Sequence, residues 1–129
     1  MSKARLKSSG VPSESAEQKW VIAWSQQPSV RQQYPELALL HHIPNERVDK
    51  VQTAILKTMG VKKGVPDLCL PVPRGNCHGL YIEMKALDGK PEADQLWWEK
   101  QLKHNGYFHA FCYGWKQAAE VLQWYLNQK

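Results

Sequence analysis

The sequence has few of the features that mark exported or membrane-spanning proteins. It contains only three cysteines, Cys69, Cys77 and Cys112, with no C-x-x-C spacing. An odd, scattered set of this kind argues against a disulfide framework and against a thiolate zinc site. No stretch approaches the roughly 18 apolar residues of a membrane span, and no apolar segment follows the basic residues near Met1. We therefore expect a reducing, intracellular setting without membrane contact.

Low complexity and internal repeats are also absent, and what remains has the composition of a folded domain. Of 129 residues, 43% are apolar and 22% are charged, which excludes a chain too polar to build a core. We expect a disordered basic tail over residues 1–12 and a single domain over residues 13–129. The net charge of +5 favours a polyanionic partner, with nucleic acid ahead of a membrane surface.

The pattern of apolar residues and helix caps predicts alternating helices and strands. Two short runs around a Gly-Asn turn predict an antiparallel hairpin. The sequence therefore predicts an α/β fold with a mixed sheet flanked by helices, in the order α-β-α-β-β-α-β-α. The predicted elements are a helix from the Ser13 cap to Pro28, a strand over 37–43, a helix over 48–59, strands over 67–72 and 80–85, a helix from Pro91 to Asn105, a strand over 107–113 and a helix over 115–127.

Charged residues at the ends of the two hairpin strands are the most informative feature. Glu83 and Lys85 lie two apart, so they project from one face of a strand, while Met84 points to the other face. A hairpin that brings Asp67 beside Glu83 would pair two carboxylates, and with a backbone carbonyl they suit Mg²⁺ or Mn²⁺ better than zinc. Lys85 would then activate a metal-bound water or stabilise charge on a phosphate. The alternative is a salt bridge between Glu83 and Lys85 with Asp67 in a turn, although apolar flanks make such charges costly without a function.

Several motifs in this order resemble the virus-type replication-repair nuclease (VRR-NUC) domain of the PD-(D/E)xK nuclease superfamily. The resemblance covers about residues 13–126, and several motifs at the right separations are more specific than any one. The matching residues are Ser13, Glu14 and Gln18; the triplet Ile43-Pro44-Asn45; the run from Gly60 to Leu68; Glu83-Met84-Lys85; Gln95, Trp98, Leu102 and Gly106; and the closing segment from Ala118 to Leu126.

The resemblance implies a restriction-endonuclease-like fold and hydrolysis of DNA phosphodiesters that depends on Mg²⁺ or Mn²⁺. It makes Asp67, Glu83 and the Met84 carbonyl metal ligands and Lys85 the catalytic lysine. Gln95 matches the family's helix glutamine and would contact a metal-bound water or the scissile phosphate, or else lie on the helix surface.

An acid on the first helix completes the family's site, and two residues compete for this role. Glu14 matches the family position, four residues before Gln18, and shares a helix face with it. Glu17 instead groups with Val21 and Trp24. We favour Glu14 as the metal ligand and keep Glu17 as the alternative.

Four further residues are candidates for DNA contact, each with an ordinary structural alternative. Lys62 and Lys63 precede the Gly64-Val65-Pro66 turn and suit phosphates beside the cut, or else form a solvated pair. Asn45 contacts DNA or makes a local turn. Gln18 is assigned to DNA contact because it shares the face of Glu14.

Short free-standing members of the family resemble homodimeric four-way-junction resolvases, and this chain has a similar length. We therefore expect a homodimeric Holliday junction resolvase of phage or bacterial origin, acting in the bacterial or host cytoplasm on branched DNA. A nuclease of the same family acting on flaps, nicks or plain duplex is the first alternative. A DNA-binding module without catalysis, suggested by the net charge, is the second.

Overall fold

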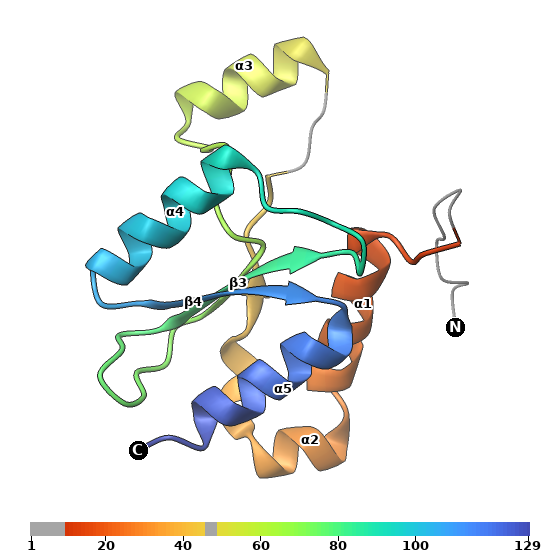
Figure 1. The fold of residues 1–129 in the computed structure, drawn as a ribbon, viewed down its shortest axis with the longest axis vertical. Coiled ribbons are helices and arrows are strands. Elements are labelled where there is room, and N and C mark those ends of the chain that lie inside the picture. The colour runs from red at the N-terminus through yellow and green to blue at the C-terminus, as the bar shows by residue number, and fades with distance from the viewer. Residues whose placement is uncertain (1–9, 46–48) are drawn as a thin grey trace.

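The computed structural model describes residues 10–45 and 49–129 (Figure 1). The predicted tail, residues 1–12, falls outside this part of the chain except for its last three residues. Within the described ranges, the helices lack the length and hydropathy of a membrane-spanning segment. The elements in chain order are α1 Glu14–Ser25, α2 Pro28–Gln33, the 3₁₀ helix η1 Pro35–Leu39, β1 His41–His42, α3 Lys50–Thr58, β2 Leu68–Leu70, β3 Leu80–Lys85, α4 Ala93–His104, β4 Phe108–Tyr113 and α5 Trp115–Leu126.

The four strands form one mixed sheet in the order β1-β2-β3-β4. β2 and β3 form the expected antiparallel hairpin, with Leu68 opposite Ile82. β4 runs parallel to β3, with Glu83 opposite Phe111. A parallel neighbour needs a crossover connection, and α4 supplies it. The mixed α/β sheet predicted from the sequence is confirmed.

The two faces of the sheet carry different residues. Alternate residues of β3, including Ile82 and Met84, enter the apolar core together with Val21 of α1 and Leu122 of α5. The other face lies against α4, where Glu99 approaches the buried His109 of β4. Glu83 and Lys85 belong to this second face, so the sheet presents its charged residues away from the main core.

The strand predicted over residues 37–43 is wrong for most of its length. Residues Pro35–Leu39 form a 3₁₀ helix, and only His41–His42 pair with β2. Leu37 is buried, whereas Leu39 is 52% exposed. An apolar run with only part of its side chains in the core lacks the two-sided burial of a central strand, and Pro35 starts a helical turn without losing a needed N–H group.

A second difference concerns Pro28, which the sequence pattern treats as the end of the first helix. The first helix does end just before it, but Pro28 also begins α2. Proline is favoured in the first turn of a helix because its missing N–H would have no partner there. The predicted helix over 48–59 is observed as α3, with Val48 outside the described residues.

Candidate active site

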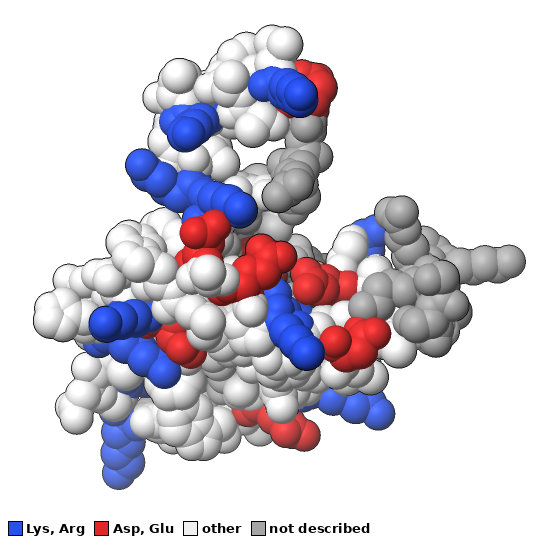
Figure 2. Space-filling view, turned by 45° about the horizontal axis from the view of Figure 1, so that its top comes forward, with Lys and Arg blue, Asp and Glu red and all other residues white. Residues whose placement is uncertain are grey.

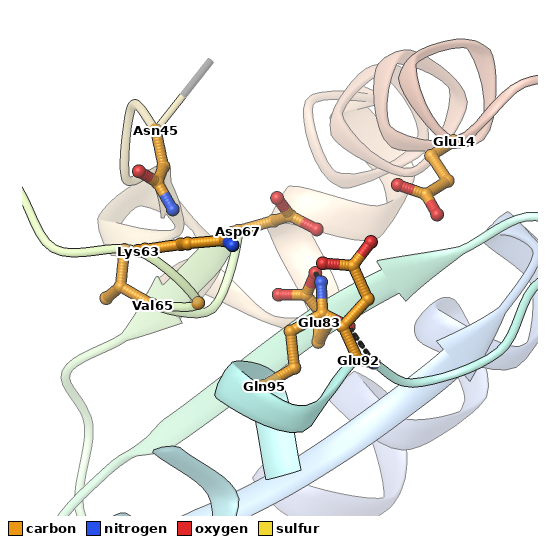
Figure 3. Close-up of a pocket in the computed structure, with 9 residues that line it drawn as sticks. Glu14, Asn45, Lys63, Val65, Asp67, Glu83, Glu92 and Gln95 are labelled. Atoms are coloured by element: carbon orange, nitrogen blue, oxygen red, sulfur yellow. Dashed lines mark hydrogen bonds between the residues drawn. The ribbon is translucent and has the colours of Figure 1, made fainter. Parts of the chain in front are cut away.

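A polar cavity of about 510 Å³ opens at the end of the β2–β3 hairpin that lies opposite its turn (Figure 3). Its walls come from α1, from the loops on either side of the segment that carries α3, from β3 and from the start of α4. The lining residues are Glu14, Asn45, Lys63, Gly64, Val65, Asp67, Glu83, Glu92 and Gln95. Segments far apart in the sequence therefore bring four carboxylates to one cavity.

Asp67 is held at the end of the hairpin by the backbone of β3. Its Oδ2 accepts a hydrogen bond from the Met84 N–H at 2.8 Å. The pairing of β2 with β3 ends at Leu68 opposite Ile82, so Met84 lies past the last paired residue of β2. The N–H and C=O of one strand residue point to the same side of the strand, so the Met84 carbonyl faces the side on which Asp67 lies.

The surroundings of Glu83 disfavour its ionised form. The residue is only 4% exposed, and its Oε2 has no hydrogen-bond partner among the described residues. Burial, reinforced by the nearby charge of Asp67, raises the pKa of Glu83 to about 9. Burial also raises the pKa of Asp67, against the Met84 N–H bond that lowers it. The buried carboxyl group of Glu83 and the half-buried one of Asp67 thus share a site, and the charge of Lys85 only partly offsets the cost for Glu83.

Gln95 joins the first turn of α4 to Glu83. Its Nε2 donates to Glu83 Oε1 at 2.8 Å, and its Oε1 accepts from the Glu92 N–H at 2.9 Å. The second bond belongs to a capping box, which satisfies a free N–H at the helix start. The helix cap therefore fixes the orientation of Gln95, and Gln95 leaves only one oxygen of Glu83 unpaired.

Lys85 is buried beside these acids, and its side chain is only 3% exposed. Nζ lies 3.8 Å from Oε1 of Glu14, whose side chain is half exposed and lines the cavity. This long ion pair leaves the Glu14 carboxylate able to take another cation.

The competing acid on α1, Glu17, has a different environment. It is buried, and its Oε1 accepts a hydrogen bond from the Trp115 N–H at 3.1 Å, at the start of α5. A carboxylate at a helix N-terminus is stabilised by the free N–H groups there. Glu17 does not line the cavity, so the geometry favours Glu14 for a role in it.

The candidate DNA-binding residues divide between the cavity and its surroundings. Asn45 and Lys63 line the cavity, whereas Lys62 is exposed outside it and the half-buried Gln18 does not line it. The loop that carries Lys63 is clamped to α4, since the Lys63 carbonyl accepts from Trp98 Nε1 at 3.0 Å.

Gly64 makes this close approach possible. Its φ is +85°, and an added Cβ would lie 2.6 Å from the Cβ of Asp94. A larger residue would therefore push the loop away from α4, and with it the segment that leads into Asp67.

Two contributors were missed by reasoning from the sequence. Glu92 lines the cavity, but the sequence did not indicate this role because an acid at the start of a helix is expected there for capping alone. His42 contacts the Asp67 carbonyl through Nδ1 at 2.8 Å. The pairing of β1 with β2 creates this contact, with His42 opposite Leu68. The sequence alone does not show which residues of these two strands lie opposite each other.

The donor set fits a hard divalent cation. Among the described residues, no three acidic, histidine or cysteine side chains form a ready-made metal group. The buried unpaired oxygen of Glu83 nevertheless lies near Asp67, and such oxygen donors are completed by water around Mg²⁺ or Mn²⁺. A cation would also relieve the cost of burying Glu83 beside the half-buried Asp67.

Comparison with known proteins agrees with this geometry. The family model of the VRR-NUC domain matches residues 12–116. A solved structure described as a "VRR_NUC domain protein" superposes with a TM-score of 0.74 at 31% sequence identity, covering 90% of this chain and 89% of that one. No curated protein matches the sequence. The chain therefore belongs to the VRR-NUC domain family, and it is a nuclease of the PD-(D/E)xK type.

Proposed function

We propose that the chain is a divalent-metal-dependent, structure-specific DNA endonuclease that resolves four-way junctions as a homodimer. The observation that carries the proposal is the Glu83 carboxylate, which is buried beside Asp67 with one oxygen unpaired among the described residues. A binding module without catalysis has no need for two carboxyl groups where phosphates would approach.

Glu83, Asp67 and the Met84 carbonyl would hold the cation, with Glu14 as the acid from α1. When bound, Mg²⁺ or Mn²⁺ supplies a water of lowered pKa and neutralises charge on the scissile phosphate. Gln95 orients Glu83 through its 2.8 Å hydrogen bond. Lys85, buried next to Glu83 along β3, would orient the attacking water or stabilise the charge that develops on the phosphate.

Lys63 on the cavity wall and Lys62 just outside it would contact phosphates flanking the cut, and Asn45 and Gln18 would contact the DNA nearby. These contacts position the backbone and carry no sequence information of their own. Affinity that depends on them should fall steeply with salt.

Homodimerisation follows from the substrate. A four-way junction has strands related by two-fold symmetry, which must be cut in pairs, while the described residues of one chain form one such carboxylate site. Two copies of the chain supply two sites.

The test is a cleavage assay on a four-way junction, a flap, a nicked duplex and a linear duplex, with Mg²⁺, Mn²⁺ or EDTA, next to sedimentation of the protein. Paired symmetric nicks in the junction, with either metal but not with EDTA, and a dimeric mass are expected. Faster cleavage of the flap or of the nicked duplex than of the junction would contradict the resolvase assignment and favour a flap or nick nuclease of the same family. No cleavage of any substrate with any divalent metal would favour a binding module.

A further inference from the structure

Helix α3 is unusual because it stands away from the rest of the fold (Figure 1). None of its residues is buried, and the other described α-helices of comparable length all bury residues. Val51 and Ile55 of α3 are 70% and 53% exposed, and Met59, which caps its C-terminal end, is 75% exposed. Their four-residue spacing places them along one side, as an apolar ridge.

A nine-residue helix without tertiary packing is marginal in water. Asp49 caps α3 by accepting a bond from the Gln52 N–H at 2.9 Å, which helps it to form but does not cover the ridge. Exposed apolar side chains in a row on a protruding helix are typical of a surface that meets a partner.

The position of α3 links it to the cavity. Asn45 and Lys63 stand on the two sides of the segment that carries α3, and both line the cavity. The helix therefore rises from the rim of the site, and a substrate that reaches the carboxylates comes close to its base.

The charge of this segment indicates the kind of partner. Residues 49–63 contain four exposed lysines and one acid, Asp49. Figure 2 shows lysines on the protrusion above acidic side chains gathered on the body. This excess of lysines attracts a polyanion. The four lysines are Lys50, Lys57, Lys62 and Lys63.

We propose that α3 is a wedge that enters branched DNA at the branch point. The ridge of Val51, Ile55 and Met59 contacts the faces of base pairs that are exposed at a branch and stacked in linear duplex. Apolar side chains are suited to this insertion between bases, and the lysines contact phosphates of the flanking arms. The inference rests on the proposed nuclease function and deepens it, since it assigns recognition of branched DNA to α3.

The experiment measures binding of the full chain in EDTA to a four-way junction and to linear duplex of the same sequence. Ile55→Gln keeps helix propensity and removes the apolar contact. We expect about a tenfold loss of affinity for the junction and less than about a twofold change for the duplex, given typical energies of base contacts. Leu39→Gln is the matched control, because Leu39 is equally exposed on η1, and it should change neither affinity.

Two further readouts separate insertion from charge. A junction labelled with 2-aminopurine at the branch should brighten when the wild-type chain unstacks the base, and it should stay dim with Ile55→Gln. Lys57→Gln should weaken binding to both DNAs and reduce the salt slope by about one.

Unchanged junction preference in Ile55→Gln, or no preference in the wild type, would overturn the proposal. So would conversion of a wild-type dimer to a monomer by Ile55→Gln in sedimentation, because a second copy would then cover the ridge. Circular dichroism should show the same melting temperature for Ile55→Gln and the wild type. Failure of the nuclease proposal would be distinct, since it would show as absent metal-dependent cleavage while these binding readouts remain measurable.

Discussion

Two glutamates in this protein are buried to the same extent but in opposite electrostatic situations. Glu17 is 3% exposed and Glu83 is 4% exposed. Glu17 accepts a hydrogen bond from the backbone at the start of α5. Glu83 receives one bond from Gln95, has an oxygen without a partner among the described residues and lies beside Asp67.

The difference teaches that burial of an acid does not by itself identify a functional site. The helix start satisfies Glu17, so its burial contributes to the stability of the fold. The surroundings of Glu83 instead raise its pKa to about 9, so the ionised form is costly until a cation arrives. The carboxylate left unsatisfied by the protein is the one available to a ligand.

The largest expected effect is the loss of DNA cleavage when the acidic site is altered. Asp67→Asn keeps an oxygen that can accept from the Met84 N–H but removes the charge. Lys85→Ala removes the buried cation. Each should lower the cleavage rate about a thousandfold with Mg²⁺, since charge stabilisation at the phosphate is lost. Junction binding should stay within a few-fold, as it rests on dispersed phosphate contacts. Full activity of Lys85→Ala would refute its role.

The next comparison replaces each buried glutamate by its amide. Glu83→Gln should reduce cleavage about a hundredfold or more, because an amide is a poor ligand for a hard cation. Glu17→Gln should cleave within about twofold of the wild type, because its carboxylate lies outside the cavity. Single-turnover rates on one junction substrate make the test, and equal losses in the two variants would erase the distinction between them.

The stability of the metal-free protein should depend on pH through Glu83. Its pKa is raised in the folded state, so the folded chain holds a proton that the unfolded chain releases above its ordinary pKa of 4.5. The free energy of unfolding should therefore fall as pH rises from about 5 toward 9, by at most about 1.4 kcal/mol per pH unit from this group.

Urea unfolding in EDTA at several pH values measures this slope. Glu83→Gln should flatten it, whereas Glu17→Gln should keep it. An unchanged slope in Glu83→Gln would show that another group carries the proton.

The smallest effect concerns the structural glutamate. Glu17→Gln keeps an acceptor for the Trp115 N–H but loses the charge at the helix start, so it should cost about 1 kcal/mol of unfolding free energy. Thermal melting in EDTA measures the change. A loss of unfolding free energy well above about 1 kcal/mol, or a gain in stability, would contradict the role of Glu17 at the start of α5.

The hairpin and the mixed sheet could be predicted from the sequence, because the alternation of residues in β3 and the turn before it are local signals. It placed Asp67, Glu83 and Lys85 on adjacent strand ends for the same reason. The strand predicted over 37–43 failed because apolar content does not reveal that Leu39 stays exposed.

The sequence favoured Glu14 over Glu17 because Glu14 shares a helix face with Gln18, but it could not show what Glu17 does instead. Both are acids in the first turn of α1, and a contact with Trp115, about a hundred residues away along the chain, distinguishes them. The cavity role of Glu92 also depends on how α4 packs, since its capping position alone explains an acid there.

Calorimetric titration with Mn²⁺ tests the central claim most directly. At pH 8, the wild-type protein should bind the ion and release a proton, because Glu83 must ionise to coordinate it. Buffers with different heats of ionisation reveal the proton. Glu17→Gln should bind in the same way, and Glu83→Gln should lose most of the affinity. Binding of Mn²⁺ by Glu83→Gln with wild-type affinity would contradict the assignment of the buried carboxylate as the metal ligand.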